Sequence, residues 1–465
     1  MSKNNLFKYL LAAATVTIAS QAWAGNVTLA DARLAATNAI RQNATGMFKT
    51  TRNITADKLT LAHAEASKAV ADANDYYAFN VAGGGWIIIA GEDRATTVLG
   101  YSDRGSLNFN NLPCTFKALL DGYKSEIEFL QTYEGDDLVS APSVTATAGV
   151  EPLITSTWGQ EEPYYLQCPV YQGEYCVVGC IATAMAQVMK YWQYPQSSNA
   201  ISSFYCYSIR QTVSALPATT FDYSLMLNSY CHWNWNTSTL VQDTYTNAQA
   251  QEAAKISRYC GQAVQMSYSP DGSGAYTNDQ LKAMKSFGYR QSAEMVERSG
   301  GYWGGGYTTA QWEAMIKTEL DAGRPILYSA SDTNGAGGHA FICDGYNSEG
   351  KFHFNMGWYG TCDGWYASTA LNMTHREGDV LKFNSDHQML IGVQPPEGWE
   401  PPAQYQTGDV NGDGTVDVTD INILVSIMLG TDSADNYDGR ANVDGEGAID
   451  VSDLNMVVNI MLGGE

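Results

Sequence analysis

A run of hydrophobic positions between residues 180 and 192 has the spacing of one face of an α-helix. Apolar side chains stand at positions 181, 185, 188, 189 and 192, which predicts a buried amphipathic helix. Pro195 prevents this helix from continuing far beyond Trp192. Cys180 therefore stands in the first turn, where free backbone N–H groups and the helix dipole favour a thiolate. This position is consistent with a nucleophile, or with a small buried core cysteine.

Alternating apolar and polar positions in the second half of the chain predict antiparallel strands. Residues 325–330 form one expected strand, and residues 339–346 form a second strand with His339 at its start. A turn at 347–350 leads into a third expected strand over residues 351–358. The central unit therefore combines a helix that begins with a cysteine and strands that carry a histidine.

The N-terminal pattern mixes helical and strand periods and predicts a separate α+β unit over residues 25–135. We expect helices over 31–41, 64–73 and 116–133, and strands over 75–81, 86–90 and 97–102. Residues 136–149 lack periodicity and read as an exposed, cleavable linker. The central unit then spans 150–397, a proline-rich linker spans 398–407, and an acidic module spans 408–465.

The first 24 residues have the pattern of a secretory signal. Lys3 and Lys8 precede a short apolar run, and Ala22-Trp23-Ala24 forms a small-x-small cleavage site. No other run is long enough to span a bilayer. We expect a secreted protein, with a periplasmic or cell-attached location left open.

The charge and the cysteine count exclude some functions. The net charge of −23 and pI near 4.5 argue against nucleic acid as a partner, because such binding needs a basic face. The nine cysteines leave at least one thiol unpaired, and their spacing predicts no particular disulfide.

Three separate motifs in the central unit carry a family resemblance. They are Gly179 to Tyr191 around the cysteine, Gly337 to Phe341 around the histidine, and Asn355-Met356-Gly357-Trp358; Trp158 to Tyr164 adds a fourth. Together they resemble the streptopain family of cysteine peptidases, peptidase family C10. The resemblance implies a papain-like α+β fold for residues 150–397. It also implies endopeptidase activity on protein or peptide substrates, with no cofactor for catalysis.

The resemblance also implies roles for individual residues. Cys180 is the expected nucleophile, His339 its base and later acid, and Gln160 a donor to the oxyanion, beside the Cys180 backbone N–H. The family usually carries a tryptophan where this chain has Met356, and a thioether is a poor partner for an imidazole. Orientation of His339 would then fall to Asn355, to a backbone carbonyl or to water, while Trp358 shields the site from water.

Residues 25–135 resemble the inhibitory prodomain of the same family around 76–81, 86–91 and 99–102. The resemblance implies that the chain is made as a zymogen, with its own prodomain as inhibitor. An ordinary accessory domain is the alternative.

The acidic module contains two loop–helix units that are 33 residues apart and have calcium-loop spacing. The expected ligands are Asp409, Asn411, Asp413, Thr415, Asp417 and Asp420 in the first loop, and Asn442, Asp444, Glu446, Ala448, Asp450 and Asp453 in the second. The duplicated pattern resembles a dockerin, a small all-α EF-hand-like module. The resemblance implies bound calcium and a cohesin-like protein partner.

The sequence therefore predicts a secreted cysteine endopeptidase made as a zymogen. The alternative is a catalytically retired homologue that acts as a secreted binding or inhibitor protein. Met356 favours this alternative, whereas the intact Cys180, His339 and Gln160 argue against it.

Overall fold

The computed structural model describes residues 25–42, 54–110, 112, 114–133, 138–140, 149–234, 239–298, 306–331, 338–368, 373–375, 387–399, 407–411, 415–437, 440–444 and 448–462. The predicted signal, Asp413 and Glu446 lie outside these residues.

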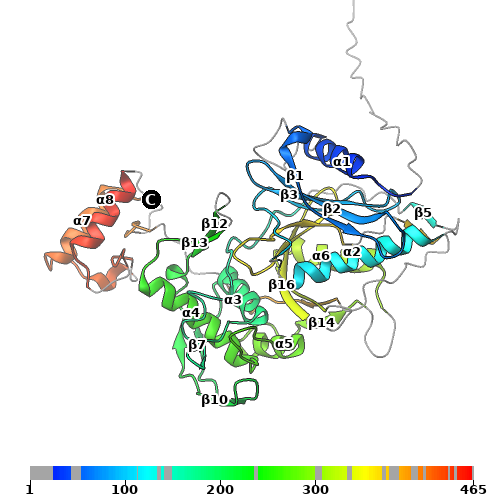
Figure 1. The fold of residues 1–465 in the computed structure, drawn as a ribbon. Coiled ribbons are helices and arrows are strands. Elements are labelled where there is room, and N and C mark those ends of the chain that lie inside the picture. Colours follow the sequence, from blue (N-terminus) through cyan, green and yellow to red (C-terminus); the bar gives the residue numbers. More distant parts are fainter. Residues whose placement is uncertain are drawn as a thin grey trace, which may run out of the picture.

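A single antiparallel sheet of ten strands runs through the N-terminal and central units (Figure 1). Its order is β1 (Leu59–Ala66), β2 (Asn74–Val81), β3 (Trp86–Ala90), β4 (Val98–Ser102), β18 (Gly364–Tyr366), β17 (Phe352–Asn355), β16 (Gly338–Tyr346), β15 (Ile326–Ser331), β20 (Gln388–Ile391) and β14 (Glu294–Glu297). The first four strands belong to the N-terminal unit and the other six to the central unit, so the two units share one sheet.

The seam between the units is the pairing of β4 with β18. Tyr101 pairs with Trp365 and Gly100 with Tyr366. A Cβ on Gly100 would lie 2.7 Å from the Tyr366 ring, so the close approach of these two strands requires glycine there. The N-terminal unit therefore completes the hydrogen bonding of a strand that would otherwise be an edge.

Helices cover both faces of the sheet. Helices α2 (Cys114–Thr132) and α6 (Thr309–Asp321) share one apolar core with strands of both units. Helix α1 (Leu29–Gln42) covers the other face of β2 and β3, and α3 (Cys180–Trp192) packs against β15 and β16 (Figure 1). Because Phe116, Tyr123 and Ile127 of α2 are fully buried, this helix also ties the two units together.

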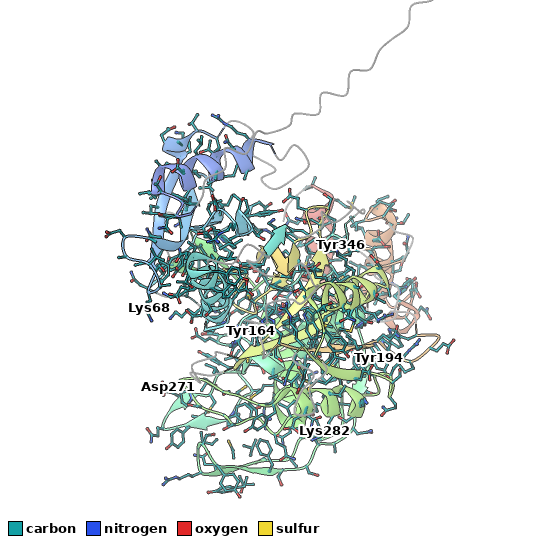
Figure 2. The ribbon with its side chains drawn as sticks, turned by 90° about the vertical axis from the view of Figure 1, so that its right-hand side faces the viewer. Lys68, Tyr164, Tyr194, Asp271, Lys282 and Tyr346 are labelled. Carbon is teal, nitrogen blue, oxygen red and sulfur yellow. The ribbon has the colours of Figure 1, made fainter. Side chains whose placement is uncertain are left out.

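A helical half completes the central unit around α3. It contains α4 (Asn247–Ala263) and α5 (Thr277–Ser286), which pack on α3 in a second apolar core. Figure 2 marks this half by Lys282 on α5 and the sheet by Tyr346 at the end of β16. Short two-stranded pairs lie outside the main sheet: β5 (Leu138–Ser140) with β19 (Met373–His375), β6 (Val170–Tyr171) with β7 (Glu174–Tyr175), β8 (Ser197–Ser198) with β11 (Thr219–Thr220), β9 (Phe204–Cys206) with β10 (Gln211–Val213), and β12 (Cys231–Asn234) with β13 (Thr239–Gln242).

The C-terminal module consists of α7 (Val418–Met428) and α8 (Val451–Met461) around a small core of its own. Val410, Leu424, Ala441 and Val457 are fully buried in it. Within the described residues, no helix is long and apolar enough to cross a membrane.

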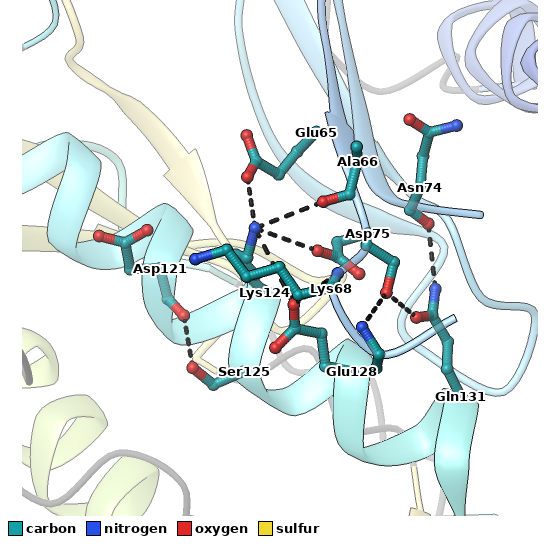
Figure 3. A network of polar contacts seen from close by, with 12 residues as sticks. Glu65, Ala66, Lys68, Asn74, Asp75, Asp121, Lys124, Ser125, Glu128 and Gln131 are labelled. Atoms are coloured by element: carbon teal, nitrogen blue, oxygen red, sulfur yellow. Dashed lines mark hydrogen bonds and ion pairs between the residues drawn. The ribbon is translucent and has the colours of Figure 1, made fainter. Parts of the chain in front are cut away.

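A charged cluster holds α2 against β1 and β2 in the N-terminal unit (Figure 3). The Lys124 ammonium pairs with Glu65, lies 3.5 Å from Asp75 Oδ2 and lies 3.9 Å from Glu128 Oε1. Asp75 is fully buried, and this burial raises the pKa of its carboxyl to about 6. Lys124 is therefore the cation that offsets a buried carboxylate at this junction.

One expected element is wrong. Residues 64–73 were predicted to be helical, but β1 extends to Ala66 and the chain then turns into β2. The helix-favouring alanines there are overridden by pairing with β2, in which Ala64 lies opposite Tyr77. In the predicted linker, residues 138–140 form the short strand β5, and residues 141–148 lie outside the described part.

Candidate active site

Cys180 begins α3, as the hydrophobic spacing predicts. Gly179 before it has a φ of 87°, and a Cβ there would lie 2.8 Å from the Met266 side chain. Glycine therefore permits both the turn into the helix and the close packing beneath it. Of the eight cysteines whose side chains the structure describes, seven are buried and Cys180 alone is partly exposed.

Two opposing effects act on the Cys180 thiol. Burial raises its pKa above the usual value, whereas the backbone N–H groups of Ala340, Ile181 and Cys180 itself lower it. Burial is the larger effect in the state with the N-terminal unit docked. Because Ala340 directly follows His339, these contacts also bring the thiol beside the histidine strand.

His339 lies near the start of β16, where the alternating pattern placed it. It is buried, and its Nε2 lies 3.3 Å from the backbone carbonyl oxygen of Met356. A carbonyl can only accept, so Nε2 carries the proton in this contact and Nδ1 is left as the basic nitrogen. The Trp358 ring lies 6.3 Å from the imidazole at 27°, and so covers it.

Two side chains fix the backbone on either side of the Met356 carbonyl. The Gly357 N–H, which belongs to the same peptide unit as that carbonyl, donates to Asn355 Oδ1 at 3.1 Å. The Met356 N–H donates to Asp363 Oδ1 at 2.7 Å. Asn355 therefore acts on His339 through one peptide unit.

A buried amide pair holds Asn355 itself. Its Nδ2 donates to the Ser156 carbonyl oxygen at 2.7 Å, and Gln187 Nε2 on α3 donates to Asn355 Oδ1 at 3.1 Å. The helix that begins with Cys180 thus also braces the segment that orients His339. The Met356 side chain is fully buried in the apolar core, so only its backbone faces the site.

Gln160 lies in a segment that is hydrogen-bonded to the residues just before Cys180. Its carbonyl oxygen accepts from the Val178 N–H at 3.0 Å, two residues before the cysteine. In the part of the chain that the structure describes, its side-chain amide makes no hydrogen bond, which leaves both N–H donors available for a ligand.

Asp363 has an unusual electrostatic environment. Burial raises the pKa of its carboxyl to about 6, while the Met356 N–H and the charges of His353 and Arg104 lower it and Asp344 raises it. Asp363 and Arg104 line a cavity of about 730 Å³ at the seam between the two units. Sequence reasoning missed Asp363 because a single aspartate seven residues from Met356 carries no motif.

Three other histidines have partners of their own. His353 Nδ1 lies 2.7 Å from Asp344 Oδ1, and His387 Nδ1 lies 2.6 Å from the Tyr328 hydroxyl. Burial lowers the pKa of His387 to about 3, so that imidazole stays neutral in the core. The exposed His232 pairs with Asp243.

In each acidic loop of the C-terminal module, a carboxylate at the start of the following helix accepts hydrogen bonds from backbone N–H groups of the loop. Asp420 Oδ1 accepts from the Asn411 N–H at 3.0 Å, and Asp453 Oδ1 accepts from the Val443 N–H at 2.6 Å. Three carboxylates of this module are almost completely buried: Asp409, Asp420 and Asp453. Buried carboxylates need a compensating positive charge. Within the described residues, which omit Asp413 and Glu446, no cluster of three or more acidic, histidine or cysteine side chains gathers around a metal position. The hard oxygen donors nevertheless fit calcium.

Comparison with known families agrees with this arrangement. The model for the peptidase C10 family matches residues 158–366, which contain Cys180, His339 and the Met356 loop. The chain belongs to the peptidase C10 family. A Spi protease inhibitor model matches residues 24–127, and a dockerin type I model matches residues 407–462. It is therefore a papain-like cysteine endopeptidase with an inhibitory prodomain and a dockerin, as the resemblance implied.

Relatives of known identity support the assignment to the C10 family. Streptopain of Streptococcus pyogenes serotype M1 is 29% identical over 343 residues, which are 69% of this chain and 81% of the relative. A thiol protease/hemagglutinin, PrtT, of Porphyromonas gingivalis is 25% identical over 337 residues, 68% of this chain and 36% of that one. A solved structure of a prointerpain A fragment of Prevotella intermedia, a Cys-to-Ala mutant, is 28% identical with a TM-score of 0.56. The alignment covers 73% of this chain and 99% of that fragment.

Proposed function

We propose that this C10 peptidase is exported as a zymogen and cleaves peptide bonds with Cys180, His339 and Gln160. His339 Nδ1 takes the thiol proton as the sulfur attacks the scissile carbonyl carbon. The resulting oxyanion accepts hydrogen bonds from the Gln160 amide and the Cys180 N–H. The imidazolium then gives its proton to the leaving amine, which departs and leaves a thioester. Water attacks the thioester, again with His339 as base, and restores the thiol.

The observation that carries this proposal is the fixed orientation of His339. Its Nε2 donates to the Met356 carbonyl, so that Nδ1 remains as the base, while the Ala340 N–H next along the strand lies by the Cys180 thiol. Asn355 and Trp358 support the imidazole by anchoring that peptide unit and by covering the ring. Met356 is no obstacle to catalysis in this scheme, because its backbone serves the site.

A matched pair of histidine variants tests the assignment. His339→Ala should lower kcat/KM for a fluorogenic peptide by about 10³-fold or more, because the imidazole serves as both base and acid. His232→Ala removes an exposed histidine that is paired with Asp243 and should keep the wild-type rate. Equal rates for the two variants would overturn the assignment of His339.

We further propose that residues 25–135 keep the enzyme latent until the segment 136–149 is cut. The support is the shared sheet, in which β4 completes the edge of β18, a strand that begins six residues after Trp358. The separate 25–135 fragment should inhibit the mature enzyme. The same fragment with Gly100→Val should inhibit at least about tenfold less well, because the added side chain would meet the Tyr366 ring. Equal inhibition by the two fragments would show that this pairing does not matter for latency.

For the C-terminal module we propose that it binds calcium and a cohesin-like protein. The expected ligands in the described part are Asp409, Asn411, Thr415, Asp417 and Asp420, with the matching positions of the second loop. Calcium would supply the positive charge that the buried carboxylates need. Isothermal titration with calcium chloride, compared between wild type and an Asp420→Ala and Asp453→Ala double variant, tests this proposal. Equal heats would refute it.

A further inference from the structure

Tyr359, directly after the tryptophan that covers His339, makes three contacts with the segment around Gln160. Its hydroxyl accepts from the Glu161 N–H at 2.9 Å, and its own N–H donates to the Trp158 carbonyl oxygen at 3.3 Å. Its ring lies over Gly159 so closely that a Cβ there would be 2.2 Å from two ring atoms. The contacts therefore fall on residues on both sides of Gln160.

The backbone of Tyr359 is set for these contacts. Its φ is 55°, in the left-handed region that non-glycine residues adopt infrequently. Burial raises the pKa of the phenol well above its ordinary value, so the hydroxyl stays neutral at physiological pH. Gly360, the next residue, packs against Thr157: a Cβ would lie 3.3 Å from its methyl carbon. The loop and the Gln160 segment thus run against each other over several residues.

From this geometry we propose that Tyr359 is a positioning residue for the oxyanion donor Gln160. The Gln160 amide extends from a backbone that Val178 holds on one side and Tyr359 holds on the other. A donor of this kind contributes to rate only when its N–H points at the developing oxyanion, and small displacements reduce that contribution strongly. The same loop also carries the Met356 carbonyl that orients His339. One short segment therefore sets the base and the oxyanion donor relative to each other.

This inference rests on the proposed role of Gln160, and a double-mutant cycle tests the two separately. Tyr359→Gly removes the ring and the hydroxyl, while glycine adopts a φ of 55° without strain. Made in the full chain and matured, this variant should lose about 10- to 100-fold in kcat, with KM within about threefold of wild type. In a Gln160→Ala background the same change should cost less than about twofold, because the group that Tyr359 positions is already gone.

The rate at which iodoacetamide alkylates Cys180 distinguishes a positioning role from a merely structural one. General damage to the site would change this rate. This reaction uses the thiolate but no oxyanion donor, so its rate should be unchanged in Tyr359→Gly and in Gln160→Ala. Tyr289→Phe is the control: its buried hydroxyl donates to the Tyr194 carbonyl, away from the catalytic residues, and it should keep wild-type kcat. Tyr359→Phe, which loses only the hydroxyl, should fall between wild type and Tyr359→Gly.

The outcomes distinguish the two claims. If Gln160→Ala keeps wild-type kcat, Gln160 is not an oxyanion donor, and the inference fails with it. If Gln160→Ala is slow but Tyr359→Gly is not, Gln160 keeps its role and only the role of Tyr359 is wrong. Full additivity of the two changes, or a parallel loss of the alkylation rate, would also overturn the positioning role.

Discussion

Removing the Asp363 carboxylate should impair His339 without touching it. Asp363 Oδ1 accepts from the Met356 N–H at 2.7 Å, and the carbonyl of Met356 accepts from His339. A hydrogen bond to a charged group contributes about 1.5–3 kcal/mol, and its loss leaves a backbone N–H unsatisfied. If about half of this free energy is lost from the stabilisation of the transition state, Asp363→Ala should lower kcat by about 3- to 15-fold.

The pH dependence gives a sharper test of the same contact. With a pKa of about 6, Asp363 is about 90% ionised at pH 7 and about 10% ionised at pH 5. Asp363→Asn keeps an oxygen acceptor but has no charge to lose. The ratio of wild-type kcat to that of Asp363→Asn should therefore fall toward one between pH 7 and pH 5.

The stability of the fold should change in the opposite sense, between about pH 4 and pH 6. Because the pKa of Asp363 is raised from 3.8, the folded protein holds this proton more tightly than the unfolded chain does. The contribution of this group to stability therefore falls as pH rises from about 4 to 6. The melting temperature of Asp363→Asn, relative to wild type, should rise over that window.

Stopped assays of matured wild type, Asp363→Asn and Asp363→Ala from pH 5 to 7 provide the measurement. Arg104, which lowers the pKa of Asp363 in the zymogen, and the N-terminal residues that help to bury Asp363 both leave with the prodomain, so the midpoint of the change in the kcat ratio measures the pKa of Asp363 in the mature enzyme. A kcat ratio that stays constant with pH, or an Asp363→Ala variant with wild-type kcat, would refute the reasoning.

Three further outcomes follow from other contacts. Lys124→Met leaves the buried Asp75 carboxylate without its cation and should lower the free energy of unfolding of the zymogen by about 3 kcal/mol. The measurement is a lower unfolding temperature and faster self-maturation than in wild type. Met356→Leu should keep kcat within about threefold, since the His339 contact uses only the backbone; a larger loss in the matured enzyme would mean that the side chain matters. Chelation of calcium should lower the unfolding temperature of the C-terminal module and leave peptidase kcat unchanged, and a loss of kcat would couple the two.

The elements that carry Cys180 and His339 were predictable from local pattern. The helix that begins at Cys180 follows from its apolar spacing, and β16 follows from alternation around His339. Both patterns arise from burial of one face, which a single sequence records directly. Such a pattern does not reveal which strands pair across units. Prediction therefore separated the prodomain from the peptidase, although the two share one sheet through β4 and β18.

The contacts that hold His339 and the Gln160 segment in place were harder to foresee. Sequence reasoning sought a side chain to orient His339 and left a backbone carbonyl open as one alternative; the structure has the carbonyl of Met356 in that position. A carbonyl is present at every residue, so no residue type marks it. Asp363 and Tyr359 act on neighbouring backbone through a local fold of the loop, and their identities carry no recognisable spacing. The predicted helix over residues 64–73 was wrong because the helix propensity of alanine is weaker than the gain from pairing with a buried strand.

Self-maturation tests the central claim most directly. The chain without residues 1–24, purified and incubated with reductant, should shorten with time as the segment 136–149 is cut, and peptide hydrolysis should rise in parallel. The Cys180→Ala chain, identical except for the sulfur atom, should keep its full length and show no hydrolysis over the same period. A Cys180→Ala chain that matures and hydrolyses peptide at the wild-type rate would contradict the account.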